Sequence, residues 1–233
     1  MATVTSIAGG APKPVFDRLG PVYEARTGHR LSALYDTMSG IQERVSKGDG
    51  LDVLLMPVSM LDDYEKAGVV LAKGRAALAD IGLGVGVKAG QPVPDISTPD
   101  MLREALQGAQ AVVHAPPTAT PSGAQSDKVI RELGLIDSMA GRIIHRAGLA
   151  GGVAAIASGE ATYGIFPQSE IVAFDGLTLV GALPPSLQLK IRYGAAVTAA
   201  SPVPGEAAAF IEFLMSPESR EVWNACGFDA PSR

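Results

Sequence analysis

Two long runs of apolar, strand-forming residues, at positions 81–88 and 189–199, constrain the fold more than any other feature of the sequence. Before, between and after them, short apolar strand patterns alternate with helix patterns, as in mainly parallel sheets covered by helices on both faces. We therefore expect an α/β protein of two lobes. The first is discontinuous (residues 1–80 and 197–233) and the second is inserted (residues 81–196). The two runs would then be hinge strands, and a ligand cleft is expected between the lobes.

Local patterns place the individual elements of each lobe. For the first lobe they predict strands at Thr3–Ala8, 29–35 and Val53–Pro57, and helices at Lys13–Thr27, 40–47, 60–66, 205–215 and 217–226. For the second they predict strands at 111–115, Tyr163–Pro167 and 177–183, and helices at Pro99–Gln107, 123–133 and Gly152–Ser158. Gly82, Gly84 and Gly86 lie inside a strand run, which favours close packing over a dinucleotide-binding turn.

Composition excludes several classes of protein. Hydrophobic residues make up 47% of the chain and charged residues 18%, so the chain is not disordered. The net charge is −5 without a basic cluster, which argues against nucleic-acid binding. No apolar run approaches the roughly 20 residues of a membrane span. The one cysteine, Cys226, excludes an internal disulfide. We expect a monomer without metal or other cofactor.

The first residues show no basic segment followed by an apolar segment, as a signal peptide would have. We therefore expect a periplasmic protein if such a peptide has been removed, and a cytoplasmic one otherwise.

Three predicted helix starts are rich in small or hydroxyl residues, which leave backbone N–H groups available to an anion. They are Gly9, Gly10 and Ala11; Thr37, Met38 and Ser39; and Ser122, Gly123 and Ala124, the last within T-P-S-G-A. Together they suggest a small anionic ligand. Ordinary helix capping by Thr37, Ser39 and Ser122 explains the same residues, so both interpretations stay open.

A series of motifs covers almost the whole chain in order: S-I-A-G-G-A, T-G-H, K-G-D-G-L-D-V-L-L-M-P, T-P-S-G-A, G-G-V-A-A-I-A-S-G-E-A-T-Y-G-I and F-I-E-F-L-M-S-P-E-S-R-E-V-W-N-A-C-G-F. In this order they resemble the type II periplasmic-binding-protein fold. Within it, the chain is similar to the molybdate-binding branch of ABC transporter solute-binding proteins, which has aconitate-isomerase-like relatives.

The resemblance implies that main-chain N–H groups and small hydroxyls hold the ligand. The matching positions are Gly9, Gly10, Ala11, Thr37, Met38, Ser39, Ser122, Gly123, Ala124, Gly151, Gly152, Pro167 and Gln168. Two departures disfavour molybdate, since the first loop lacks the family's serine and Phe166-Pro167-Gln168 replaces its tyrosine. The Gln168 amide can both donate and accept, which favours an organic carboxylate.

The resemblance leaves three functions open. One is a solute-binding protein that delivers a small anion to an ABC-type importer, with its permease as partner. The alternatives are a cofactor-independent isomerase of a small unsaturated polycarboxylate, on the same fold, or a cytoplasmic ligand sensor. An isomerase needs a base, for which His114 and Glu170 are the candidates. Arg75 could pair with a ligand carboxylate or could be a surface arginine.

Overall fold

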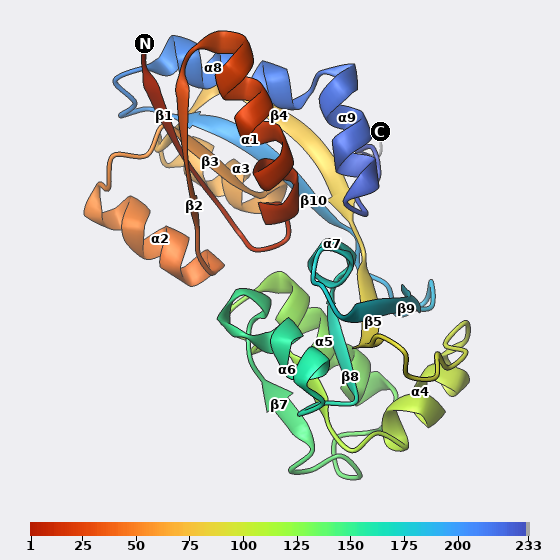
Figure 1. The fold of residues 1–233 in the computed structure, drawn as a ribbon. Coiled ribbons are helices and arrows are strands. Elements are labelled where there is room, and N and C mark those ends of the chain that lie inside the picture. Colours follow the sequence, from red (N-terminus) through yellow and green to blue (C-terminus); the bar gives the residue numbers. More distant parts are fainter. Residues whose placement is uncertain (232–233) are drawn as a thin grey trace. The chain divides into compact units, whose positions relative to one another are not determined.

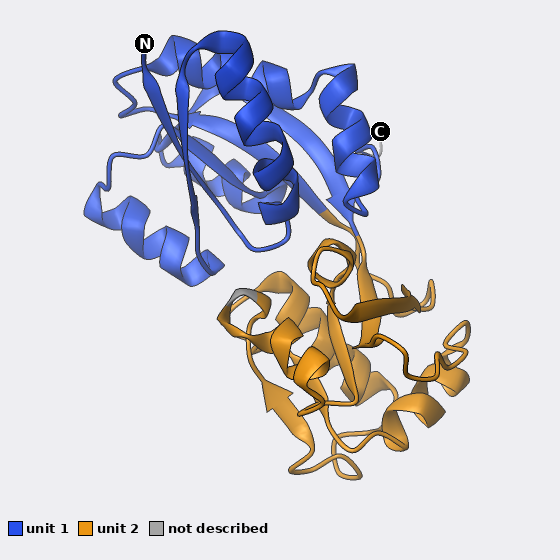
Figure 2. Ribbon diagram, in the orientation of Figure 1, with its two compact units in different colours: residues 1–81, 192–233 blue, residues 82–191 orange. Residues whose placement is uncertain are grey.

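The computed structural model describes residues 1–231, apart from the side chain of Leu149. The chain forms two compact units, residues 1–81 with 192–233 and residues 82–191 (Figure 2). Each unit has its own five-stranded sheet. Residues 192–196, expected in the inserted lobe, lie in the first unit because their strand pairs with a strand of that unit.

The sheet of unit 1 has the strand order β2-β1-β3-β10-β4 (Figure 1). Its strands are β1 (Thr3–Ala8), β2 (Arg30–Tyr35), β3 (Val53–Pro57), β4 (Val70–Ile81) and β10 (Ile191–Thr198). Strand β1 is parallel to both β2 and β3, whereas β10 is antiparallel to β3. The parallel part of the sheet therefore consists of β2, β1 and β3.

The described helices of unit 1 are α1 (Lys13–Thr27), α2 (Met38–Lys47), α3 (Val58–Lys66), α8 (Pro204–Leu214) and α9 (Pro217–Ala225). Helices α2 and α3 pack on the sheet through a buried cluster that includes Ile41 and Leu61. Helices α1 and α8 meet through edge-to-face ring contacts of Phe210 with other aromatic side chains. Trp223 of α9 is fully buried, and its indole N–H donates to the carbonyl of Leu214 at 3.1 Å.

The sheet of unit 2 has the strand order β7-β6-β8-β5-β9. Its strands are β5 (Leu83–Lys88), β6 (Val112–His114), β7 (Ile143–His145), β8 (Tyr163–Pro167) and β9 (Leu177–Ala182). Strand β6 is parallel to β7 and β8, and β5 is antiparallel to β8 and β9. The fold class is thus confirmed as two-lobed α/β, with sheets that are mixed.

The helices of unit 2 are α4 (Pro99–Gln107), α5 (Pro121–Glu132), α6 (Gly152–Ser158) and α7 (Gln168–Val172), with a short 3₁₀ helix, η1 (Gly148–Ala150). Successive side chains of a strand point to opposite faces of the sheet. Accordingly, Val112 packs in the cluster with α4 and α5, whereas Val113 packs in the cluster with α6 and α7. The sheet of unit 2 lies between these two pairs of helices.

Several elements differ from the sequence-based expectation. The first apolar run, residues 81–88, is broken at Gly82: β4 ends at Ile81 and β5 begins at Leu83. A side chain at Gly82 would press on the amides of Gln168 and Gln188. The strand before this break, β4, is long and was expected only from residue 81. Among the described residues, no helix is long and apolar enough to cross a membrane.

Candidate functional site

The candidate residues of unit 1 follow the carboxyl ends of its parallel strands. Strand β1 leads into α1, β2 into α2, and β3 into α3. Since these strands are parallel, their carboxyl ends share one edge of the sheet, which is where open α/β sheets bind ligands. The loop after β1 touches the start of α2 there, because a Cβ at Gly9 would lie 2.6 Å from Cε of Met38. The structure thus brings Gly9, Gly10 and Ala11 to the start of α2.

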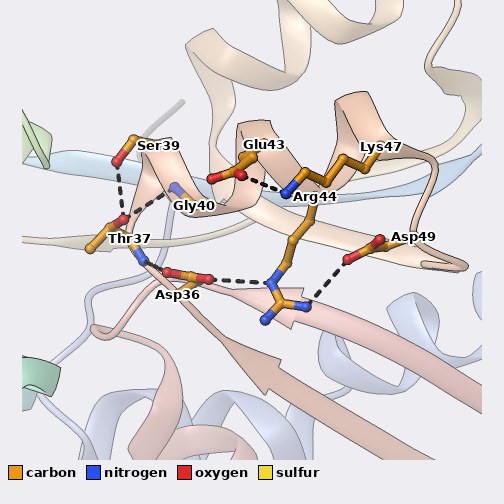
Figure 3. Close-up of polar contacts among 8 residues, drawn as sticks. All are labelled: Asp36, Thr37, Ser39, Gly40, Glu43, Arg44, Lys47 and Asp49. Carbon is orange, nitrogen blue, oxygen red and sulfur yellow. Dashed lines mark hydrogen bonds and ion pairs between the residues drawn. The ribbon is translucent and has the colours of Figure 1, made fainter.

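The start of α2 is capped by Thr37. Its side-chain oxygen accepts the N–H of Gly40 at 3.1 Å and lies 3.1 Å from the hydroxyl of Ser39 (Figure 3). The amides of Met38 and Ser39 precede the first intrahelical bond, so the helix itself does not use them. Capping is therefore the role of Thr37, and the exposed Ser39 is left with a hydroxyl that can turn toward a ligand.

The start of α5 repeats this arrangement in unit 2. The side-chain oxygen of Thr120 accepts the N–H of Gly123 at 3.0 Å and lies 3.0 Å from the hydroxyl of Ser122, which is buried. Thr120 was not among the expected site residues. The signal for it is the Thr-x-Ser-Gly pattern, which occurs at 37–40 and again at 120–123. Ser122 was expected as a possible cap of α5, whereas Thr120 is the cap.

The remaining candidates of unit 2 also follow parallel strands. Strand β6 leads to α5, β7 to η1 and α6, and β8 directly to α7. Gly151 and Gly152 therefore lie at the same sheet edge as Pro167 and Gln168. A Cβ at Gly152 would lie 2.7 Å from the ring of Phe166, so the start of α6 is in contact with a side chain of β8. Ala124 lies in the first turn of α5 and is exposed.

A hollow of about 330 Å³ lies at the other end of the same sheet. It is lined by Val87, Lys88, Gln91, Pro92, Gly159, Ala161, Thr162 and Tyr163. Tyr163 begins β8, whereas Pro167 ends it. This hollow therefore does not coincide with the candidate residues.

Arg75 lies within β4, not in the expected link, and its guanidinium contacts α3. It forms ion pairs with Asp62 and Glu65, the latter at 2.5 Å, and donates to the carbonyl of Val58 at 3.3 Å. Its side chain is only 18% exposed. These contacts hold α3 on β4. Pairing of Arg75 with a ligand carboxylate stays a prediction.

His114 is fully buried at the carboxyl end of β6. Its Nδ1–H donates to the carbonyl of Ala115 at 2.8 Å, which leaves the Nε2 lone pair without a hydrogen-bond partner among the described residues. His145 is its register partner on β7, and the centroids of the two imidazole rings lie 4.8 Å apart. Burial lowers the pKa of His114, which favours the neutral imidazole.

Glu170 lies in α7, and its carboxyl group presses against the Cα of Gly148, where a side chain would collide. Burial raises the pKa of Glu170 to about 7. A carboxyl with such a pKa can exchange a proton near neutral pH. No hydrogen bond joins Glu170 to His114 in the part of the chain that the structure describes, so these two candidates do not form a pair.

Within residues 1–231, no cluster of three histidine, cysteine, aspartate or glutamate side chains could hold a metal ion. The groups that gather at the two sheet edges are instead hydroxyls, backbone amides and glycines. Such groups bind anions through hydrogen bonds, without a metal.

Comparison with known families decides the family of the chain. Residues 4–229 match the family described as bacterial extracellular solute-binding protein. This chain belongs to that family. The expected resemblance is thereby confirmed, and solved structures agree with it. The chain superposes on the periplasmic molybdate-binding protein of Azotobacter vinelandii with a TM-score of 0.84, over 98% of this chain and 100% of the other, at 18% identity.

Other relatives of this chain are named for different ligands or activities. It is 29% identical to an aconitate isomerase of Pseudomonas sp. over 226 residues, which are 94% of this chain and 84% of the relative. It is 27% identical to the molybdate-binding protein ModA of Escherichia coli K12 over 116 residues, 48% of this chain and 43% of that one. A sulfate-binding protein of Mycobacterium tuberculosis shares the fold, with a TM-score of 0.78 and 20% identity, over 99% of this chain and 87% of the other.

Proposed function

We propose that this chain binds a small organic anion, as the solute-binding component of an ABC-type importer, and that the start of α2 in unit 1 and the start of α5 in unit 2 each offer donors suited to an anion. The observation that carries the proposal is the recurrence of Thr-x-Ser-Gly, once in each unit, with matching hydrogen bonds of 3.0–3.1 Å at both helix starts. In both, the threonine caps the helix and the serine hydroxyl lies beside the threonine oxygen.

Two features favour a carboxylate over molybdate. The first loop, Gly9-Gly10-Ala11, offers no hydroxyl, whereas Gln168 offers an amide that both donates and accepts. The relative that matches 94% of the chain is named for aconitate, whereas the molybdate-binding relative matches 48% of it. Action in the periplasm with a permease as partner belongs to the same proposal, and fractionation of the native host tests that location.

Equilibrium binding tests the proposal directly. We expect trans-aconitate, cis-aconitate or a related di- or tricarboxylate to bind and to raise the melting temperature, while molybdate, tungstate and sulfate bind weakly. A ligand at about 100 times its Kd adds roughly 2.7 kcal/mol to the free energy of unfolding. Calorimetric titration supplies the Kd. Stabilisation by molybdate and tungstate alone would overturn the carboxylate assignment and leave anion binding in place.

A second function, isomerisation of a small unsaturated polycarboxylate, is favoured by the long match to aconitate isomerase. Moving a double bond requires a base that removes a carbon-bound proton and later returns one. Glu170, with its pKa of about 7, and neutral His114 are the groups that could do so. NMR of cis- and trans-aconitate in deuterated buffer would show interconversion or deuterium uptake. Loss of exchange in Glu170→Gln or His114→Gln, with binding retained, would identify the base, whereas binding without exchange leaves the solute-binding function alone.

A further inference from the structure

A carboxylate lies beside the anion-competent start of α2. Asp36 follows β2 directly, and its Oδ1 accepts the N–H of Thr37 at 2.8 Å. The same carboxylate presses on the Cα of Gly40, where any side chain would collide with it. The Asp36 side chain, which precedes the N-cap Thr37, is therefore held against the first turn of the helix whose start offers the amide of Ser39.

This placement has two opposite electrostatic effects. A negative charge beside the first turn stabilises a helix, because it interacts favourably with the partial positive charge of the helix start. The same charge repels an anionic ligand that binds to those amides. Without compensation, Asp36 would weaken the anion binding for which the start of α2 is otherwise suited.

Arg44 supplies a compensating charge from the C-terminal part of α2. Its Nε donates to Oδ2 of Asp36 at 3.2 Å (Figure 3). Its Nη1 donates to Oδ2 of Asp49, a residue just after the helix, at 3.3 Å. The Arg44 side chain thus links the residues that flank both ends of α2. These side chains are 33–43% exposed, so solvent screens them in part.

We propose that Arg44 is a positioning residue for anion binding: it holds and neutralises Asp36, so that the start of α2 keeps its affinity for a negative ligand. This inference rests on the proposed function, because it assigns the start of α2 to the ligand. Arg44 does not touch the ligand and acts only through Asp36.

A purely structural ion pair predicts different behaviour. In that case, removal of either partner would weaken the helix and lower the affinity alike. Charge balance instead predicts opposite changes in affinity. Loss of Arg44 leaves the negative charge of Asp36 uncompensated and weakens binding, whereas loss of the Asp36 charge removes the repulsion. Lys47 provides a matched control: it lies in the same helix, carries the same charge and pairs with Glu43 at 2.5 Å rather than with Asp36.

The test is the Kd of the whole chain for trans-aconitate and for molybdate, measured by calorimetry at low and at physiological ionic strength. We expect Arg44→Met to weaken binding about 3- to 10-fold, by Coulomb repulsion between Asp36 and the anion in a partly screened setting. The loss should be larger at low ionic strength. Asp36→Asn should bind at least as tightly as the wild type even though its melting temperature falls. The double variant Asp36→Asn/Arg44→Met should restore near wild-type affinity.

Two further variants separate this role from a loss of folding. Arg44→Lys keeps the charge and should keep the affinity, and Lys47→Met should leave it within about two-fold of the wild type, since an exposed pair contributes little. Equal effects of Arg44→Met and Lys47→Met, or a double variant as weak as Arg44→Met, would overturn the inference while anion binding stands. A wild type that binds neither probe would overturn both the inference and the proposed function.

Discussion

Threonine and serine hydroxyls have separate roles at the two helix starts. The threonines of the Thr-x-Ser-Gly segments accept the N–H group of the third helical residue. Among residues 1–231, the hydrogen-bond partner of each serine hydroxyl is the threonine hydroxyl, at 3.1 Å for Ser39 and 3.0 Å for Ser122. Because a hydroxyl can rotate, each serine can donate to a ligand while the cap stays intact.

Single substitutions separate these roles. Ser39→Ala and Ser122→Ala should each lower the binding free energy by about 1.5–3 kcal/mol, because each removes a hydrogen bond to a charged ligand. Thr120→Ala, the control, should lower the free energy of unfolding by about 0.5–2 kcal/mol through loss of the cap. Calorimetric titration and urea unfolding of all three variants provide the two measurements. A serine variant that loses stability and keeps its affinity would assign that serine to the helix alone.

Glu170 makes the stability depend on pH. Its pKa in the folded chain is about 7, against an ordinary value of 4.5, because burial disfavours its charged form. The folded chain then keeps a proton that the unfolded chain loses, so this contribution is complete below pH 4.5 and is lost as pH rises toward 7. We expect the wild type to lose on the order of 2–3 kcal/mol across this window relative to Glu170→Gln. Urea unfolding between these pH values checks this, and parallel curves for the two proteins would contradict it.

At the scale of elements, the start of α5 lies against the end of β6 at a distance that only glycine permits. A Cβ at Gly123 would come within 2.6 Å of the carbonyl oxygen of Ala115. The contacted oxygen belongs to the backbone, so it cannot turn aside as a flexible side chain could. The strand and the helix that presents Ser122 are thus fixed to each other.

Gly123→Ala should therefore destabilise the chain by about 1–3 kcal/mol through overpacking, and it should weaken ligand binding as α5 shifts. Gly205 in α8 is the matched control, because no atom would meet its Cβ within 4 Å. Gly205→Ala should be neutral or stabilise by about 0.4–1 kcal/mol, since it restricts the unfolded chain. Guanidinium unfolding measures both, and equal effects of the two substitutions would show that the close approach at Gly123 is unimportant.

Elements with regular patterns could be predicted from the sequence, and irregular ones could not. The strands Thr3–Ala8, Val53–Pro57 and Tyr163–Pro167 have the bounds that their apolar runs predict. Strand β4 was missed before residue 81 because Lys73, Gly74 and Arg75 interrupt its apolar pattern and are half-buried or exposed. Helix α7 has only five residues, too few for a helical period to show.

The candidate site shows the same division. Small residues and hydroxyls at helix starts can be read directly from the sequence, and the parallel strands explain why they gather at one edge within each unit. Partners far along the chain cannot be read in this way. The contacts of Arg75 with Asp62 and Glu65 depend on how α3 packs on β4, and the burial of Glu170 depends on its packing against Gly148.

At the scale of the whole molecule, unit 2 is contiguous (residues 82–191) and has its own two clusters of buried side chains. We expect a fragment of these residues to fold cooperatively, whereas residues 1–81 should not fold without 192–233, which supply β10, α8 and α9. Circular dichroism and amide NMR spectra of both fragments test this. A disordered 82–191 fragment would show that unit 2 depends on unit 1 for stability.

The burial of Trp223 gives the two units different optical properties. It is the only tryptophan of the chain and lies in unit 1, edge-on to Phe228 at 4.9 Å, whereas unit 2 carries no tryptophan and only Tyr163 among the five tyrosines. Intrinsic emission excited at the red edge of the absorption band therefore reports on unit 1 alone, while far-ultraviolet dichroism reports on both. Unfolding curves recorded with the two signals will coincide if the units melt together and diverge if they melt in sequence.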